Sequence, residues 1–371
     1  MTKIDIAHPA SPPPAPRVRI IRTGPRGLGN PTSDFAALLR TVEEAGLLRR
    51  RRGFYLGMYI GAAALFVAAW VAFALLRGTW YELIVAAVLG ILFTQFAFLA
   101  HESAHRQVWK TAAVNDAWGR FLASFMVGIS YAWWMTKHSR HHASPNTIDR
   151  DPDIDPDFIL FQERHARETR GLYAWLIRRQ GWLFFPALTL EGLNLHMQAI
   201  RTVFFRADVD KRGLEITFIL VRNVSYLAAV FTFLPLGMAF AFLGVQLAVF
   251  GVYMGGSFAP NHKGMPQIPH DAKIDFLRRQ VTTSRNVYGL GTTTLMGGLN
   301  YQIEHHLFPN MPRPYLKRAR VIVREYCAAR DVPYTEATLI ESFGIVIAYL
   351  NRVGLSARDP FDCPAAQAFG R

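Results

Sequence analysis

Two uncharged stretches, FYLGMYIGAAALFVAAWVAFALL at residues 54–76 and LIVAAVLGILFTQFAFLA at residues 83–100, decide the fold of this chain. As a helix rising about 1.5 Å per residue, the first stretch is about 34 Å long, enough to cross the hydrocarbon layer of a bilayer. The connection through Arg77 and Gly78 is very short, so the second stretch returns toward the side where the first began. Residues 54–100 are therefore predicted to form a transmembrane helical hairpin.

A second hairpin is predicted further along the chain. The forty positions 223–262 contain no Asp, Glu, Lys or Arg. Pro235 and Gly237 interrupt them where one helix could not continue, so we predict spans at about 216–234 and 237–258. With 51% hydrophobic and 18% charged residues, the chain is not a disordered, collagen-like or small secreted protein.

Positive charge is concentrated outside the predicted spans. The chain has 41 Lys and Arg against 27 Asp and Glu, a net charge of 41 − 27 = +14. Segments 49–52, 101–213 and 263–330 are basic, whereas the two hairpin turns carry Arg77 alone. Because basic loops stay in the cytoplasm, we predict a multi-pass protein with termini and large loops on that side, and no nucleic-acid partner. The arginine-rich segment 164–179 fits equally well a helix on an anionic membrane surface and a solvated basic helix.

The chain is predicted to have three parts. Residues 1–48 are predicted to be a disordered, proline-rich and basic tail, residues 49–335 a membrane domain, and residues 336–371 a C-terminal helix and tail. Segments 119–135 and 182–200 are apolar but short or interrupted by charge, which indicates interfacial or re-entrant helices. The predicted fold is an all-α integral membrane protein with four transmembrane helices in two hairpins, interfacial helices and a cytoplasmic helical cap.

Eight of the twelve histidines lie in four short places, each near the predicted cytoplasmic end of a span or in the cytoplasmic loops. The first, His101-Glu-Ser-Ala-His105, has i,i+4 spacing, and two further sets have i, i+3, i+4 spacing, so each set shares one helical face. Neutral imidazole is a good ligand for iron, copper, zinc and nickel. The candidate metal ligands are His101, His105, His138, His141, His142, His262, Gln302, His305 and His306.

The number of candidates favours a two-metal site, since seven histidines and Gln302 exceed what one ion can use. Cysteine is absent from the sets, which favours a non-haem iron pair over structural zinc. His262 alone would suit a helix end, but it emerges on the same face as the other sets and is predicted as an extra ligand. Glu102 and Asp153 are candidate carboxylates for orienting the imidazoles, although turn chemistry explains Asp153 equally well. Arg222, inside the third span, either snorkels to the surface or contacts substrate.

Together these sets resemble the membrane fatty acid desaturase family, whose three histidine boxes have the patterns HxxxH, HxxHH and (H/Q)xxHH. Gln302 at the head of the third box resembles the delta-6-type or front-end subgroup. The stretches 146–154 and 283–287 also resemble that subgroup, and the resemblance covers about residues 50–335.

The resemblance implies a membrane-bound fatty acyl desaturase whose boxes hold two iron ions, with His262 as an additional ligand and Gln302 as a ligand or near-ligand. Such an enzyme uses O2 and two external electrons to introduce a cis double bond into an acyl-lipid or acyl-CoA. Eukaryotic front-end relatives often carry a fused cytochrome b5 domain with an HPGG motif, whereas this N-terminus offers only His8-Pro-Ala-Ser. We therefore expect a separate electron donor, such as a ferredoxin or a flavoprotein reductase.

Three alternatives stay open at this stage. A diiron hydroxylase or epoxygenase could use the same boxes and add oxygen to the substrate in place of removing a second hydrogen. The HExxH pattern with Glu102 as general base also fits an intramembrane zinc protease, which would leave the second and third boxes without a role. A transporter would place its polar residues in the middle of the membrane, whereas these histidines are predicted at one face.

Overall fold

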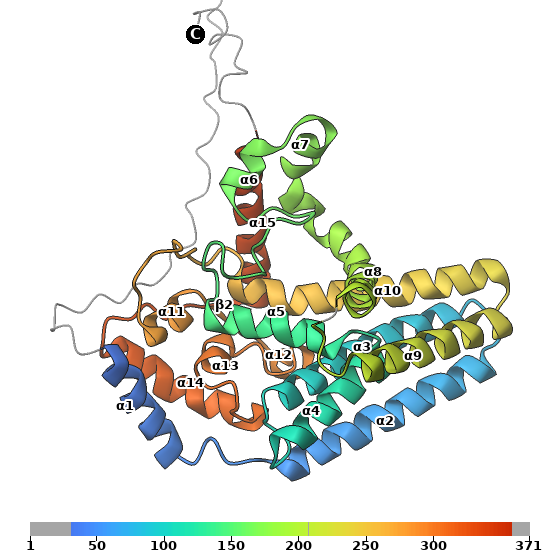
Figure 1. Cartoon of the computed structure of the whole chain (residues 1–371), viewed down its shortest axis with the longest axis horizontal. Helices are drawn as coiled ribbons and strands as arrows, with labels where there is room; N and C mark the ends of the chain where they lie inside the picture. Colours follow the sequence, from blue (N-terminus) through green and yellow to red (C-terminus); the bar gives the residue numbers. More distant parts are fainter. Residues whose placement is uncertain (1–30, 207, 358–371) are drawn as a thin grey trace, which may run out of the picture.

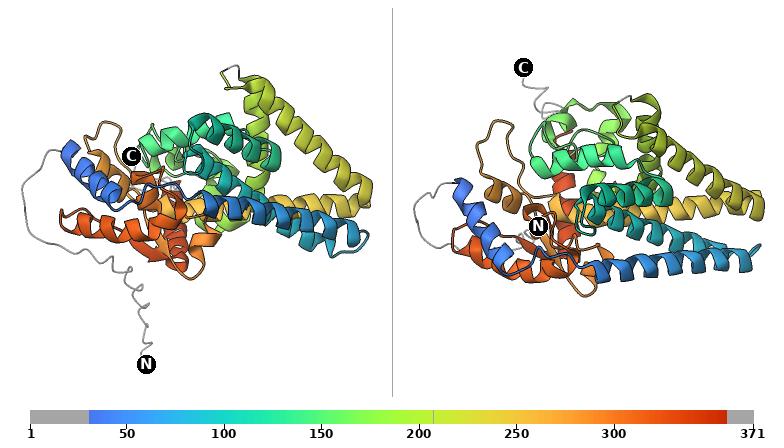
Figure 2. Two further views of the ribbon diagram at one scale, coloured as in Figure 1. Left: turned by 90° about the horizontal axis from the view of Figure 1, so that it is seen from below. Right: turned by 60° about the horizontal axis from the view of Figure 1, so that its bottom comes forward.

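The computed structural model describes residues 31–206 and 208–357, most of which are helical. Four helices of this part are long and apolar enough to cross a membrane: α2 (Arg52–Leu75), α3 (Glu82–Ala104), α9 (Arg212–Phe233) and α10 (Leu236–His262). They extend from one side of the molecule, and the other helices are gathered toward the opposite side (Figures 1 and 2). The predicted class, a mostly helical protein with four candidate spans, is confirmed.

Two of these helices continue beyond the limits of the predicted spans, at the end that carries histidines. α3 and α10 each extend four residues beyond the predicted limit, to Ala104 and His262 respectively. The last turn of any helix leaves carbonyls without intrahelical partners. At the end of α10 the buried Arg285 guanidinium donates to the carbonyls of Pro260 and Lys263, at 2.5–3.1 Å. This contact holds the end of α10 in place.

α3 is the inner helix of the four. Most of it is buried, whereas α2 and α9 expose most of their residues. Phe93 of α3 and Phe242 and Phe250 of α10 belong to one buried apolar cluster. α10 also crosses α8 (Gln180–Phe205) at Gly192 and Gly251, where a Cβ on either residue would collide with the backbone of the other helix. The absence of side chains at both positions therefore lets α8 pack directly on α10.

The shorter elements, gathered toward the side of the molecule where α3 and α10 carry their histidines, are here called the cap (Figure 1). The cap helices are α1 (Pro31–Glu44), α4 (Ala112–Arg120), the π-helix η1 (Phe121–Val127), α5 (Tyr131–Ala143), α6 (Glu163–Glu168), α7 (Gly171–Ile177), α11 (Phe276–Thr282), α12 (Thr292–Leu295), α13 (Gln302–Leu307), α14 (Arg313–Ala328) and α15 (Leu339–Leu355). Two short strands, β1 (Asn286–Tyr288) and β2 (Glu336–Thr338), pair in parallel. Side chains of α1, α11, α13 and α14 share one buried apolar cluster, which holds the third histidine set in place.

The prediction of a disordered tail is wrong in its second part. Residues 31–44 form α1, and Leu38 and Val42 are completely buried in the cluster shared with α11 and α14. Their spacing is helical, but the proline-rich residues before them dominate the composition of the tail. Residues 1–30 lie outside the described residues.

The C-terminal helix is present as α15, but it does not begin a separate part of the molecule. β2, which immediately precedes α15, pairs with β1 of the predicted membrane domain, Tyr288 lying opposite Thr338. The predicted boundary after residue 335 therefore cuts through the small sheet. Residues 358–371 lie outside the described residues.

Of the two segments predicted as interfacial helices, one is continuous and one is broken. Residues 182–200 lie within α8, a single helix of 26 residues. Residues 119–135 comprise the end of α4, all of η1 and the start of α5. Gly128, with a left-handed φ of 95°, ends η1, and the Ser130 hydroxyl caps α5 by accepting a hydrogen bond from the Trp133 N–H. The apolar pattern of this segment did not reveal the break.

Candidate metal centre

The first histidine pair lies at the end of α3. His101 is in the last turn of the helix and His105 directly follows it, and their ring centroids are 4.6 Å apart. The next residue, Arg106, has a left-handed φ of 59° and turns the chain away from the helix axis. The structure thus brings both imidazoles to one face, as their spacing predicts.

α5 and α13 carry the second and third sets. The ring of Trp134 stacks on His138 in α5, with centroids 4.4 Å apart. All six residues of α13 are buried. Before α13, Gly297 and Gly298 adopt left-handed φ values of 58° and 84°, and a Cβ at Gly297 would lie 2.5 Å from Phe98 of α3. This close approach presses the third set against the end of α3.

The eight histidines gather into two groups. The five-histidine group contains members of all three boxes, His101, His105, His138, His142 and His305, whose ligand nitrogens all lie within 4.8 Å of one another. The three-histidine group consists of His141, His262 and His306, also within 4.8 Å. The groups are adjacent, since the rings of His142 and His306 stack with centroids 4.2 Å apart.

The nitrogens of the five-histidine group are spaced as ligands of one ion would be. The Nε2 atoms of His105 and His138 are 2.8 Å apart, and those of His142 and His305 are 3.1 Å apart. Imidazole nitrogens bind zinc, a typical first-row metal, at about 2.0–2.1 Å, so two nitrogens on one such ion lie roughly 2.8–3.4 Å apart as the angle between them goes from 90° to tetrahedral. The observed separations fit a shared metal ion.

The nitrogen separations of the three-histidine group also fit a shared metal ion. The Nε2 atoms of His141 and His262 are 3.3 Å apart. Nε2 of His306 is buried and has no hydrogen-bond partner among the described residues, which suits an atom whose lone pair binds a metal. Both groups therefore fit metal ions.

Outer partners orient two of these three imidazoles. The Nδ1–H of His262 donates to the Thr283 carbonyl at 3.0 Å, and that of His306 donates to Gln280 Oε1 at 2.9 Å. Such partners fix the tautomer and leave Nε2 to bind a metal. Neither Gln280 nor Thr283 was predicted as a partner of the imidazoles, because no spacing rule connects them to the histidine sets.

Asp151, rather than Asp153, is the main carboxylate partner of His141. The fully buried Asp151 accepts the His141 Nδ1–H with both oxygens at 3.0 Å. Asp153 is 3.4 Å from the same nitrogen and forms a salt bridge with Lys137 at 3.0 Å. Burial alone would raise the pKa of Asp151, but the contact with His141 brings it below its usual value. Both aspartates share one loop, so the sequence alone did not separate them.

Burial keeps the imidazoles of the five-histidine group neutral. It lowers the pKa of His105 from 6.5 to about 3. Burial, followed by repulsion from neighbouring imidazoles, lowers the pKa of His138, His142 and His305 well below 6.5. A neutral imidazole carries the lone pair that a metal requires, so the group is in its ligand form at neutral pH.

The sequence that carries this centre matches a known protein family. The model of the family described as fatty acid desaturase matches residues 78–338, which contain every histidine of both groups. The chain belongs to the fatty acid desaturase family. With its four candidate spans, this desaturase is a membrane protein and an oxidoreductase that acts on fatty acyl chains.

Curated relatives agree with this assignment. A delta-8 fatty acid desaturase 2 of Arabidopsis thaliana is 30% identical over 76% of this chain and 65% of its own length. A delta-8 fatty acid desaturase of Helianthus annuus is 26% identical over 88% of this chain and 74% of its own length. A delta-6 fatty acid desaturase of Caenorhabditis elegans is 28% identical over 86% of this chain and 74% of its own length. The resemblance drawn from the histidine boxes is confirmed.

Glu102 of this desaturase has a different role from the predicted one. Its carboxylate forms a buried bidentate salt bridge with Arg313 of α14, with Nε–Oε1 and Nη2–Oε2 distances of 2.7 and 2.8 Å. The Tyr55 hydroxyl of α2 also donates to it at 3.4 Å. Glu102 therefore ties α3 to α14 and α2 rather than orienting an imidazole. The same contacts leave it unsuited to act as the base of a zinc protease.

Gln302 contacts the three-histidine group. Its Nε2 lies 2.9 Å from Nε2 of His262, and its Oε1 accepts a hydrogen bond from Asn261 Nδ2 at 3.3 Å. The amide is thus held beside the group by the last turn of α10.

Arg222 does not snorkel to the surface. It lies in the middle of α9 and is only 9% exposed. Its guanidinium lies 4.8 Å from the ring centroid of Phe93 and 4.6 Å from that of Tyr226. These cation–π contacts bind it to the interior of the helix bundle.

Proposed function

We propose that this desaturase introduces a cis double bond into a fatty acyl chain at a non-haem diiron centre, with O2 as the oxidant. The observation that carries the proposal is the division of eight histidines into two adjacent groups that each fit a metal ion. Neither group contains cysteine, and such imidazole-rich sites suit iron. When bound, the two irons would supply the oxidant from O2 that breaks two unactivated C–H bonds. The balanced change is –CH2–CH2– + O2 + 2 e− + 2 H+ → –CH=CH– + 2 H2O.

Different residues of this chain would bind the two irons and orient the metal ligands. The five-histidine group would bind one iron, and the three-histidine group would bind the other, with Gln302 as a ligand or near-ligand. Asp151, Thr283 and Gln280 keep the outer nitrogens protonated, so the inner nitrogens point toward the shared space. The ring of Trp134 covers His138 on one side.

We propose that the four long helices cross the membrane as two hairpins, α2–α3 and α9–α10, with the cap and both termini in the cytoplasm. The concentration of Lys and Arg outside the spans supports this orientation. α8 would lie at the membrane surface, because Trp182, Leu190 and Met197 are exposed along one of its faces.

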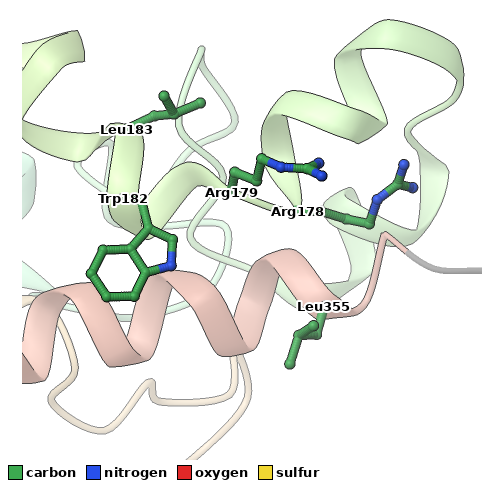
Figure 3. Close-up of a pocket in the computed structure, with 5 residues that line it drawn as sticks. All are labelled: Arg178, Arg179, Trp182, Leu183 and Leu355. Carbon is green, nitrogen blue, oxygen red and sulfur yellow. The ribbon is translucent and has the colours of Figure 1, made fainter.

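A shallow pocket at the start of α8 favours the membrane-surface explanation of segment 164–179. Arg178, Arg179, Trp182 and Leu183 line it together with Leu355 of α15 (Figure 3). Two guanidinium groups beside an exposed tryptophan suit the boundary between lipid headgroups and acyl chains.

The acyl chain would arrive as an acyl-lipid or an acyl-CoA. A cavity of about 450 Å³ on the outer face of α5 is suited to the phosphates of either carrier. The cations that line it are Arg106, Arg120, Lys137, Arg140 and Arg206, and the carboxylates are Asp116, Asp208 and Asp210. Arg120 and Arg206 are already paired with Asp210 and Asp208. The exposed Arg106 and Arg140 are therefore the residues best placed to bind a phosphate.

A separate protein would deliver the two electrons, either a ferredoxin or a flavoprotein reductase. The basic surface of the cap suits an acidic donor. We also assign the chain to the front-end subgroup, on the basis of Gln302 and of relatives named delta-6 and delta-8 desaturases.

Expression of the full chain with a suitable reductase, followed by mass spectrometry of total acyl chains, tests the proposal. We expect a new cis double bond, which His305→Ala abolishes. Oxygenated products in place of alkenes would instead identify a hydroxylase or epoxygenase with the same centre. Metal analysis of the purified protein should find two irons per chain, and a single zinc would overturn the diiron assignment.

A further inference from the structure

An apolar patch lies where the small sheet meets the long helices. β1 and β2 run in parallel, so the chain leaves both strands at the same edge. Two residues beyond Tyr288, Leu290 is completely exposed at 103%, and two residues beyond Thr338, Ile340 is 84% exposed. Leu295 of α12 is also exposed, at 53%. Three exposed leucine and isoleucine side chains near one edge of the sheet indicate a surface that contacts something other than water.

The sequence around this patch lacks charged residues. The eighteen residues 286–303 contain no Asp, Glu, Lys or Arg. In α14, by contrast, six of sixteen residues are charged. An uncharged segment within a basic cap indicates a surface that does not face water.

Hydrogen bonds fix how far this segment reaches along the spans. Gln95 Nε2 of α3 donates to the Tyr253 hydroxyl of α10 at 2.6 Å, and that hydroxyl donates to the Leu295 carbonyl at 2.6 Å. Gln95 precedes His101 by six residues, which corresponds to about 9 Å along a helix. Leu295 is therefore linked through Tyr253 to a level of α3 that lies about 9 Å further toward the far ends of the spans than the first histidine.

The patch continues the outward-facing surface of α3. Ile84, Val88 and Ile91 are exposed on one face of that helix, at 61%, 39% and 44%. Gln95 is the next position on the same face, and about one turn further on Phe98 of α3 packs against Met296 of the 288–296 segment in one buried cluster. The lipid-facing stripe of α3 thus leads directly onto the exposed side chains of this segment.

We infer that residues 288–296, together with Ile340, dip into the bilayer and contact lipid acyl chains. The inference rests on the proposed membrane crossing by α2, α3, α9 and α10. It gives the third histidine box a lipid-facing neighbour, since only six residues separate the end of α12 from the start of α13. The occupant of the patch is the acyl-chain region of the bilayer and not another protein.

Site-specific fluorescence tests this inference. A single cysteine is introduced as Leu290→Cys in a full-length chain that carries Cys327→Ala and Cys363→Ser, labelled with an environment-sensitive dye and reconstituted into phosphatidylcholine nanodiscs. Lipids with a nitroxide on the acyl chain should quench the label, and aqueous iodide should not. Val88→Cys on the lipid-facing side of α3 and Glu325→Cys at the exposed end of α14 are matched controls.

Comparison with the control variants distinguishes a failure of this inference from a failure of the proposed membrane crossing. If Val88→Cys is quenched by lipid but Leu290→Cys is quenched by iodide, the patch faces water and the inference is overturned. If neither quencher reaches Leu290→Cys, protein covers the patch, which also overturns it. If Val88→Cys itself is not quenched by lipid, the proposed membrane crossing fails first.

Discussion

Replacing Asp151 by asparagine should weaken metal binding at the three-histidine group while preserving the shape of the site. The carboxylate accepts the His141 Nδ1–H at 3.0 Å, the Asn146 backbone N–H at 2.7 Å and the Asp153 backbone N–H at 2.9 Å. An amide supplies only one oxygen, so its NH2 group must face a donor. If it faces His141, the imidazole proton moves to Nε2, which can then no longer bind a metal. Loss of such a partner typically lowers metal affinity about 10- to 100-fold, or about 1.4–2.7 kcal/mol.

Titration of the metal-free enzyme with ferrous iron against a competing chelator measures this loss. Asp153→Asn is the matched control, because Asp153 is further from His141, at 3.4 Å, and is shared with Lys137. We expect a much smaller change in iron affinity for Asp153→Asn than for Asp151→Asn. Unchanged affinity in Asp151→Asn, or an equal loss in both variants, would refute the assignment of Asp151 as the orienting carboxylate.

Three further predictions follow from other contacts. His306→Ala should lower the iron content from two per chain to one or fewer and abolish desaturation, and a variant that still binds two irons by metal analysis would contradict the assignment of this ligand. Glu102→Gln leaves the buried Arg313 without a charged partner, so it should lower the free energy of unfolding by about 3–5 kcal/mol; thermal unfolding in detergent checks this, and an unchanged melting temperature would contradict it. Gly251→Leu should lower the melting temperature because a side chain there collides with α8, whereas Gly244→Leu on the same helix, with open space around it, should not; equal effects would argue against the close crossing.

Much of the fold is encoded in features that a sequence shows directly. Long apolar runs with few charges predicted all four long helices, because charges are rare in spans and helices must be long enough to cross the bilayer; Arg222 is the one charge inside the four predicted spans. The missed helix α1 is short and depends for its stability on burial of Leu38 and Val42 against α11 and α14, which are distant in the sequence. Tertiary packing of this kind leaves no local pattern strong enough to outweigh the proline-rich residues beside it.

The candidate ligands were predictable by spacing, but their division into groups was not predicted. His141 and His142 are neighbours in the sequence and belong to different groups, as do His305 and His306. Successive residues of an α-helix point about 100° apart, so adjacent histidines cannot easily share one ion. The partners Asp151 and Gln280 could not be found in this way, because only the folded chain brings them to the imidazoles.

The division of adjacent histidines between the groups has a consequence for how the metals load. α5 and α13 each supply neighbouring residues to both groups, so each short helix has one rotational setting that satisfies both ions at once. The first ion to bind fixes this orientation of the helices. It thereby places the histidines of the other group for metal binding before the second ion arrives. Binding of the two ions is therefore expected to be cooperative, and removal of either ion should lower the affinity of the protein for the other. A half-loaded enzyme should be a minor species, even when iron is scarce.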